Sequence, residues 1–175
     1  MSSADHILGT ILGVRHQSIP IWSSFPCWGG PTQVSQWSQT INSTVQQYHV
    51  THVLGFNEPQ QPGQSNLTPS DAANLWKSQL EPLKAQGILL GSPAPSSAPN
   101  GKQWLLEWMQ ACGGWDGSQG GCTVDFVALH WYDINSMAFI QYLEDFYATF
   151  QKPIWVTEWA CQVGFLRQPY AMKLI

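Results

Sequence analysis

Charged residues are scarce in this sequence, and their scarcity excludes one class of function. They make up 10% of the 175 residues, whereas about a quarter is usual for a globular chain. The seven lysines and arginines are scattered along the chain, and the net charge is −4. Phosphate contacts need clusters of basic side chains, so we expect no nucleic-acid partner. The polar surface must instead consist of Ser, Gln, Asn and Thr, which suits an extracellular protein.

Long hydrophobic runs are missing as well. No apolar stretch reaches the ~18 residues of a membrane-spanning helix, so we expect no membrane span. The opening segment, MSSADHILGTILGVRH, has Asp5 and His6 where a secretion signal carries positive charge, and it is not a convincing signal peptide. No Gly-x-Gly-x-x-Gly motif follows a strand-like segment, which leaves dinucleotide binding without support.

Cysteines are few, but the spacing of two of them is informative. Cys112 and Cys122 bracket a glycine-rich loop, GGWDGSQGG, between a helix-like and a strand-like segment. We expect a disulfide there that adds about 2–3 kcal/mol of stability; the alternative is two reduced thiols in a cytosolic protein. Nothing in the sequence pairs Cys27 with Cys161, and we expect no bond between them.

Strand-like and helix-like segments alternate from residue 20 onward. The strand-like segments are nearly continuous apolar runs, which is typical of a parallel sheet with both faces covered. This order predicts an α/β fold, either a (β/α)8 barrel or a doubly wound open sheet. The expected strands are 20–28, 51–57, 87–94, 123–133 and 152–160, and the expected helices are 32–48, 68–83, 101–112 and 136–150.

Two of the expected strands end in a glutamate. Glu58 follows the apolar run VLGF, and Glu158 follows IWV. In a barrel, the carboxyl ends of the strands converge on one rim, where catalytic groups lie. Glycoside hydrolysis needs two carboxylates, one protonated and one ionised, about 5–5.5 Å apart in retaining enzymes. We therefore predict that this pair faces one another and is catalytic, rather than two solvated strand ends.

The ten tryptophans have two possible roles. Most of them are expected to pack in the core. An indole at the carboxyl end of a strand can instead stack on the apolar face of a sugar ring. Trp159, next to Glu158, is a candidate for such a contact.

Three segments, LGFNEP, FVALHWYD and KPIWVTEWA, resemble the signature strands of the alkali-sensitive-linkage-type glycosyl hydrolases, glycoside hydrolase family 128. The resemblance runs from about Trp28 to about Ala160. It implies a (β/α)8, TIM-barrel-type fold and hydrolysis of β-1,3-glucan without a cofactor or metal. It further implies that Glu58 is the acid/base and Glu158 the nucleophile.

The resemblance also implies sugar-binding residues and a setting. Asn57 corresponds to the amide that bonds the sugar 2-hydroxyl, and Trp28 to a tryptophan at the end of barrel strand 3. The strand-6 motif HWYD, with His130, Trp131 and Tyr132, is expected to line the site near the nucleophile. The implied partner is a β-glucan polysaccharide or oligosaccharide, bound by a monomer that is extracellular or in the cell wall.

The two ends of the chain depart from the family pattern. Counting 51–58 as strand 4 and 152–158 as strand 7 places strands 3 to 7 within residues 20–162. Residues 1–19 and 163–175 resemble no part of the family, so we expect an incomplete barrel with reduced activity. Two alternatives stay open: a non-hydrolytic glucan-binding remnant, and a clan relative that acts on β-1,4-glucan or mannan.

Overall fold

The computed structural model describes residues 31–161, and parallel strands form the framework of this part. Strand β1 (His52–Leu54) pairs in parallel with β2 (Leu89–Gly91), and β3 (Val127–Tyr132) pairs in parallel with β4 (Ile154–Ala160). A parallel bridge from Gly91 to Phe126 connects the two pairs. The strands therefore lie side by side in chain order, as the alternation of segments predicted.

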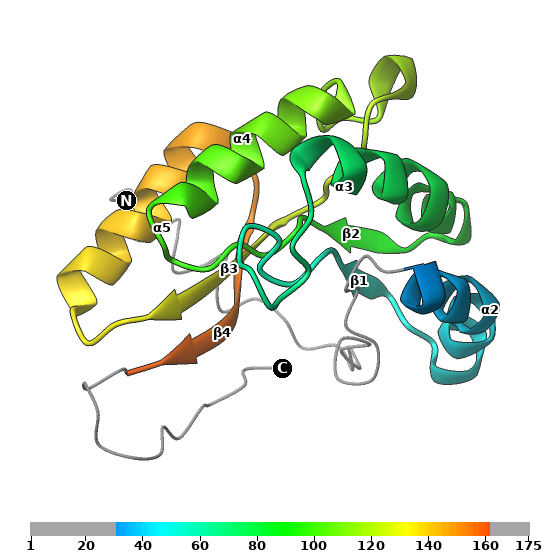
Figure 1. Cartoon of the computed structure of the whole chain (residues 1–175), viewed down its shortest axis with the longest axis horizontal. Coiled ribbons are helices and arrows are strands. Elements are labelled where there is room, and N and C mark those ends of the chain that lie inside the picture. Colours follow the sequence, from blue (N-terminus) through cyan, green and yellow to red (C-terminus); the bar gives the residue numbers. More distant parts are fainter. Residues whose placement is uncertain (1–30, 162–175) are drawn as a thin grey trace.

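Helices follow the strands and lie along one side of them (Figure 1). The expected helix 68–83 begins as α3, capped by the Thr68 hydroxyl, which accepts a hydrogen bond from the Asp71 N–H. It then changes to a π-helical and a 3-10 turn, because Pro82 lacks the N–H that a continued α-helix needs. The helical elements are α2 (Pro31–Tyr48), α3 (Pro69–Leu75), η2 (Trp76–Leu80), η3 (Glu81–Gln86), α4 (Asn100–Cys112), η4 (Ser118–Gly120) and α5 (Ser136–Phe150).

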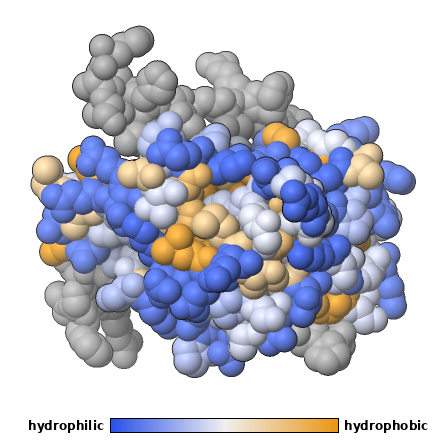
Figure 2. Space-filling model, turned by 90° about the horizontal axis from the view of Figure 1, so that it is seen from above, coloured by the Kyte–Doolittle hydropathy of each residue, from blue (hydrophilic) through white to orange (hydrophobic). Residues whose placement is uncertain are grey.

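Tryptophans form much of the core between the strands and the helices. Trp76 and Trp108 are fully buried, with ring centroids 4.9 Å apart, and Trp115 lies 5.5 Å from Trp108. The expectation that most of these residues pack inside is confirmed for the described part of the chain. The outer face of the helices is mainly hydrophilic, around a smaller apolar area (Figure 2). None of the helices within residues 31–161 has the length and apolar character that a membrane crossing requires.

A second, smaller aromatic layer runs across the strands. The Phe126 ring stacks on Trp155 at 4.1 Å, and His52 lies 4.9 Å from the Trp155 ring. Gly91 is needed beneath this layer, because a Cβ there would lie 2.5 Å from the Phe126 ring. Side chains from β1 and β4 thus meet over the middle of the sheet.

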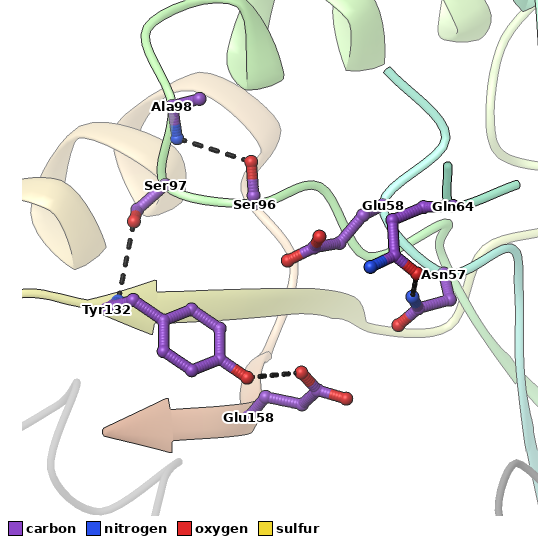
Figure 3. A pocket seen from close by; sticks show the side chains of 8 residues that line it. All are labelled: Asn57, Glu58, Gln64, Ser96, Ser97, Ala98, Tyr132 and Glu158. Atoms are coloured by element: carbon purple, nitrogen blue, oxygen red, sulfur yellow. Dashed lines mark hydrogen bonds between the residues drawn. The ribbon is translucent and has the colours of Figure 1, made fainter. Parts of the chain in front are cut away.

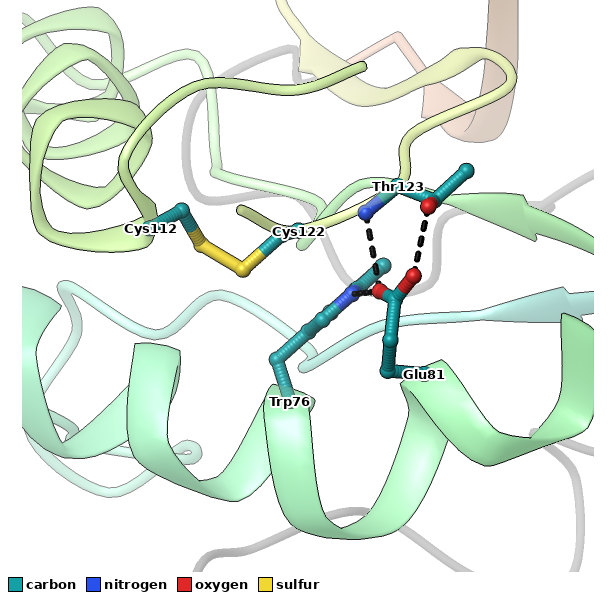
Figure 4. Close-up of a disulfide and its surroundings, with 5 residues drawn as sticks. All are labelled: Trp76, Glu81, Cys112, Cys122 and Thr123. Carbon is teal, nitrogen blue, oxygen red and sulfur yellow. Dashed lines mark hydrogen bonds between the residues drawn. A yellow bond between two sulfur atoms is a disulfide. The ribbon is translucent and has the colours of Figure 1, made fainter. Parts of the chain in front are cut away.

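A disulfide joins Cys112, at the end of α4, to Cys122, with the Cα atoms 5.3 Å apart (Figure 4). The predicted bond is confirmed. Next to it, the Glu81 carboxylate accepts hydrogen bonds from the Trp76 indole at 3.0 Å and from the backbone N–H and hydroxyl of Thr123. The disulfide therefore joins the two ends of the glycine-rich loop, and Glu81 holds Thr123 at its carboxyl end.

Several expectations concern residues outside the described part. The expected strand 20–28, with Cys27 and Trp28, lies there, as do the segments 1–19 and 163–175. Cys161, the last described residue, is a free, exposed thiol.

Candidate active site

The carboxyl ends of β3 and β4 and the loop after β1 bring His130, Glu158 and Glu58 together. His130 Nδ1 lies 3.1 Å from Glu58 Oε1 and 3.5 Å from Glu158 Oε2. One oxygen of each glutamate and a ring nitrogen of His130 lie within 4.8 Å of one another. The two carboxylates thus face each other beside a buried imidazole, at a separation close to the ~5–5.5 Å of a retaining pair.

An irregularity in β4 points Glu158 toward this group. Trp155 pairs with Ala128 and Val156 with Leu129, but the next pair is His130 with Glu158, so Thr157 is an extra residue. Its hydroxyl donates to the Leu129 carbonyl at 3.4 Å. In a regular strand, Trp155 and Glu158 would face opposite ways, because they are three residues apart. The extra residue of a bulge puts them on one face. The bulge therefore places Glu158 on the same face as His130.

Glu58 is positioned by its backbone rather than by a strand. Its φ of 39° lies in the left-handed region, which costs a residue with a side chain on the order of 1–3 kcal/mol. Two hydrogen bonds hold this conformation: the Glu58 N–H donates to the Ala94 carbonyl, and the Glu58 carbonyl accepts from the Gln61 N–H, both at 2.9 Å. Backbone strain that neighbouring bonds maintain is common at functional sites.

Tyr132 is the hydrogen-bond donor to Glu158. Its hydroxyl lies 2.5 Å from Glu158 Oε2. Burial raises the pKa of Tyr132 well above its usual range, and the hydrogen bond to Glu158 and the negative charges of both glutamates raise it further. The hydroxyl hence keeps its proton at physiological pH. This hydrogen bond holds the Glu158 carboxylate in place at the pocket.

A pocket of about 510 Å³ opens over the two glutamates (Figure 3). Its described walls contain carboxylates, amides and hydroxyls but no basic side chain, so the pocket complements an uncharged polar ligand. The lining residues are Asn57, Glu58, Gln64, Ser96, Ser97, Ala98, Tyr132 and Glu158.

The structure separates the residues of the HWYD strand. Tyr132 lines the pocket, and His130 lies between the carboxylates, only 2% exposed. Trp131 faces the other way and packs on Phe139 and Tyr142 of α5, with ring centroids 5.4 and 5.2 Å away. Its expected place in the site was wrong, because neighbouring residues of a strand point to opposite faces.

Trp159 is corrected for the same reason. It pairs with Trp131 in the β3–β4 register and follows Glu158 directly, so it lies on the face away from the pocket. It is half-buried and is not among the described residues that line the pocket. Asn57 does line the pocket, and its amide N–H donates to Gln64 Oε1 at 3.0 Å. Trp28 lies outside the described residues.

Sequence reasoning missed the pocket residues that come from loops. Gln64 belongs to the loop after β1, and Ser96 and Ser97 belong to the loop after β2. Gln60 and Gln61 tie these loops together by donating to Ser96 Oγ at 2.8 and 2.9 Å. Loops show no periodicity, but one signal was present: SPAPSSAP follows a strand whose end lies at the same rim.

His130, Glu58 and Glu158 are also residue types that bind divalent metals, and no other such group occurs within residues 31–161. Glu158 Oε2, the oxygen near His130, already accepts a hydrogen bond from the Tyr132 hydroxyl. The arrangement is that of acid groups joined by hydrogen bonds, which suits proton transfer better than metal binding.

Comparisons with known proteins agree on a family. The profile described as "Glycosyl hydrolase catalytic core" matches residues 15–172, which extends past the expected boundaries at 20 and 162. Over 112 residues the chain is 38% identical to Alkali-sensitive linkage protein 1 of Schizosaccharomyces pombe, covering 62% of this chain and 19% of that protein.

Two of the similar solved structures are β-1,3-glucanases of family GH128. A curdlan-specific exo-enzyme from Blastomyces gilchristii has a TM-score of 0.67 and 25% identity, covering 88% of this chain and 65% of that one. An endo-enzyme from Lentinula edodes has a TM-score of 0.62 and 27% identity, covering 73% and 48%. The chain thus spans less than two thirds of the length of these relatives.

Proposed function

The chain belongs to the glycosyl hydrolase catalytic-core family and is of the GH128 type, and from that premise we propose that it hydrolyses β-1,3-glucan with retention of configuration. The observation that carries the proposal is the pair of carboxylates, Glu58 and Glu158, whose facing oxygens lie within 4.8 Å over a pocket of neutral polar side chains. This separation leaves no room for a water between the sugar and the second carboxylate, as an inverting mechanism would require.

The surroundings of the two glutamates support distinct roles. Glu158 accepts a hydrogen bond from the Tyr132 hydroxyl, which holds the carboxylate in place at the pocket and suits a nucleophile. In the proposed first step, Glu158 attacks the anomeric carbon while Glu58 protonates the departing glycosidic oxygen, and a glycosyl ester forms. In the second, Glu58 takes a proton from water, the water oxygen bonds to the anomeric carbon, and the bond from that carbon to Glu158 breaks, which frees the carboxylate.

The β-1,3 linkage and the glucan are inferred from what the similar structures act on. The pocket itself supports an uncharged sugar, because amides and hydroxyls rather than basic groups line it. We assign Asn57 to a sugar hydroxyl, in line with its place on the pocket wall. His130, which contacts both carboxylates, is assigned to their mutual orientation.

For the rest of the fold, we propose that β1 to β4 are strands 4 to 7 of a (β/α)8-type barrel. Their parallel pairing in chain order and the helices between them support this count. The catalytic domain at 20–162, the flanking segments and the monomeric state remain predictions. An extracellular or cell-wall location is supported by the Cys112–Cys122 disulfide, a bond typical of oxidising compartments.

A hydrolysis assay on laminarin tests the proposal. The purified chain should release reducing sugar, and NMR of the first product should show the β-anomer. Glu58→Gln and Glu158→Gln should each remove activity, whereas Glu144→Gln, an exposed glutamate on α5, should leave it unchanged. Laminarin binding without any release of sugar would favour a glucan-binding protein instead. Turnover of β-1,4-glucan or mannan but not of laminarin would show that the enzyme cleaves another linkage.

A further inference from the structure

Gln64 occupies a defined place beside the proposed catalytic pair, although it lies outside the strand motifs. The loop that carries it folds back on itself: the Ser65 N–H donates to the Asn57 carbonyl at 3.2 Å, and the Leu67 N–H donates to the Pro59 carbonyl at 2.9 Å. Gly63, with φ 88°, makes the turn that a side chain would strain. These backbone hydrogen bonds bring Gln64 next to Asn57, so the loop backbone determines the position of Gln64.

The two amides form a complementary pair. Asn57 Nδ2 donates to Gln64 Oε1 at 3.0 Å, which uses one donor and one acceptor. The remaining groups, Asn57 Oδ1 and Gln64 Nε2, point toward the pocket interior, on the side of Glu58 and Glu158 (Figure 3). Gln64 Nε2 makes no hydrogen bond to another described residue. An acceptor and a donor therefore lie side by side on the pocket wall.

A sugar hydroxyl is the group that such a pair fits. A hydroxyl donates one hydrogen bond and accepts others, so it can give its proton to an amide oxygen while its oxygen accepts from an amide N–H. A charged ligand would need a basic or an ionised partner, and neither amide supplies one. The half-buried setting makes an unmatched amide group costly, which turns a missing hydroxyl into a penalty.

We propose that Gln64 is a substrate-binding residue that donates a hydrogen bond to the sugar hydroxyl whose proton Asn57 accepts. The pair recognises the presence and direction of one hydroxyl of the sugar ring next to the catalytic carboxylates. That the ligand is a sugar rests on the proposed function; that Gln64 and Asn57 act on one group of it rests on their geometry.

Two variants separate direct contact from support of Asn57. Gln64→Met removes both the acceptor that holds Asn57 and the pocket-facing donor. Gln64→Glu keeps an acceptor for Asn57 but removes the donor. Gln110→Met, at an exposed position of α4, is the matched control. All are made in the catalytically blocked Glu158→Gln background for binding, and in the wild type for turnover at the pH optimum of each variant.

The probes are a β-1,3-linked glucose oligosaccharide and analogues that each lack one hydroxyl of the ring at the cleavage site. With the full oligosaccharide, both Gln64 variants should bind about tenfold more weakly, the effect of one lost hydrogen bond, and turn over correspondingly more slowly. With the one analogue that lacks the recognised hydroxyl, the variants and the wild type should differ by less than about twofold. The control should match the wild type throughout.

Binding by Gln64→Glu within about twofold of the unsubstituted site would show that Gln64 only supports Asn57 and would overturn the proposal. So would an effect of Gln64→Met of equal size on every analogue, since no hydroxyl would then be its partner. If laminarin is not hydrolysed but binding still depends on Gln64 and on one hydroxyl, the proposed function fails and this assignment stands.

Discussion

Glu81 and Glu158 are half-buried glutamates on the same chain, but their hydrogen bonds differ. The Glu81 carboxylate accepts from the Trp76 indole and from the backbone N–H and hydroxyl of Thr123, so both of its oxygens are bonded (Figure 4). Glu158 accepts from the Tyr132 hydroxyl through one oxygen, and its other oxygen has no hydrogen bond to a described residue. The comparison separates a structural carboxylate, which is saturated, from a carboxylate available for chemistry.

The regions around the two glutamates follow the same division. Near Glu81, both oxygens of Asp125 are also bonded: Oδ1 accepts from Lys84 Nζ at 3.0 Å, and Oδ2 accepts from Lys84 Nζ at 2.8 Å and from the Leu90 N–H at 2.6 Å. Near Glu158, the Glu58 carboxylate is bonded only to His130 among the described residues, and the Glu58 backbone is held in a strained conformation. The carboxylates near the disulfide loop thus have all their hydrogen bonds, whereas those at the pocket rim do not.

Removing the disulfide should give the largest loss of stability. In the double variant Cys112→Ser, Cys122→Ser, the free energy of unfolding should fall by about 2–3 kcal/mol, because the unfolded chain regains the freedom of a short loop. Urea denaturation measures this change. Laminarin turnover at 25 °C should persist, since the loop lies away from the pocket; its loss in a still folded variant would mean that the two regions are coupled.

Sequence reasoning predicted the elements that depend on strand ends and on local spacing. Glu58, Glu158 and the Cys112–Cys122 pair were all identified this way. Period-two alternation would have excluded Trp131 and Trp159, because each directly follows a residue that faces the site; the resemblance of the HWYD strand to its family does not separate the two faces of the strand. The alternation had to be applied to each strand separately, because the extra residue Thr157 shifts the register in β4.

Other features could not be read from the sequence because they depend on contacts between distant segments. The bulge at Thr157 appears only when β4 is aligned with β3. The two hydrogen bonds from Thr123 to Glu81 join residues 42 positions apart, and Gln60 and Gln61 reach Ser96 across 36 and 35 positions. No local pattern in the chain marks such partners.

Substituting Tyr132 should have an intermediate effect, on activity rather than on stability. Tyr132→Phe removes the donor to Glu158 but keeps the ring, so kcat/KM on laminarin should fall about tenfold, the cost of one hydrogen bond. The free energy of unfolding should change little. Unchanged kinetics would show that Glu158 does not need this donor.

The smallest expected effect is that of alkaline pH on the free energy of unfolding. Burial raises the pKa of Tyr132 and of Tyr142 well above the ordinary value of about 10. Above that value the unfolded chain loses phenol protons that the folded chain keeps, so the free energy of unfolding should fall as pH rises. Denaturation between about pH 8 and 11 should show a gentler fall in Tyr142→Phe than in the wild type; identical slopes would contradict the burial of its hydroxyl.

The most direct test of the account is to compare Glu158→Gln with Glu81→Gln in both activity and melting temperature. Glu158→Gln should lower laminarin turnover on the order of 10⁴-fold or more, with the melting temperature nearly unchanged. Glu81→Gln should leave turnover intact at 25 °C but lose about 2 kcal/mol of stability, or roughly 4–8 °C in melting temperature, because an amide N–H would face donors. A turnover loss in Glu81→Gln without a stability loss, or full activity in Glu158→Gln, would contradict the account.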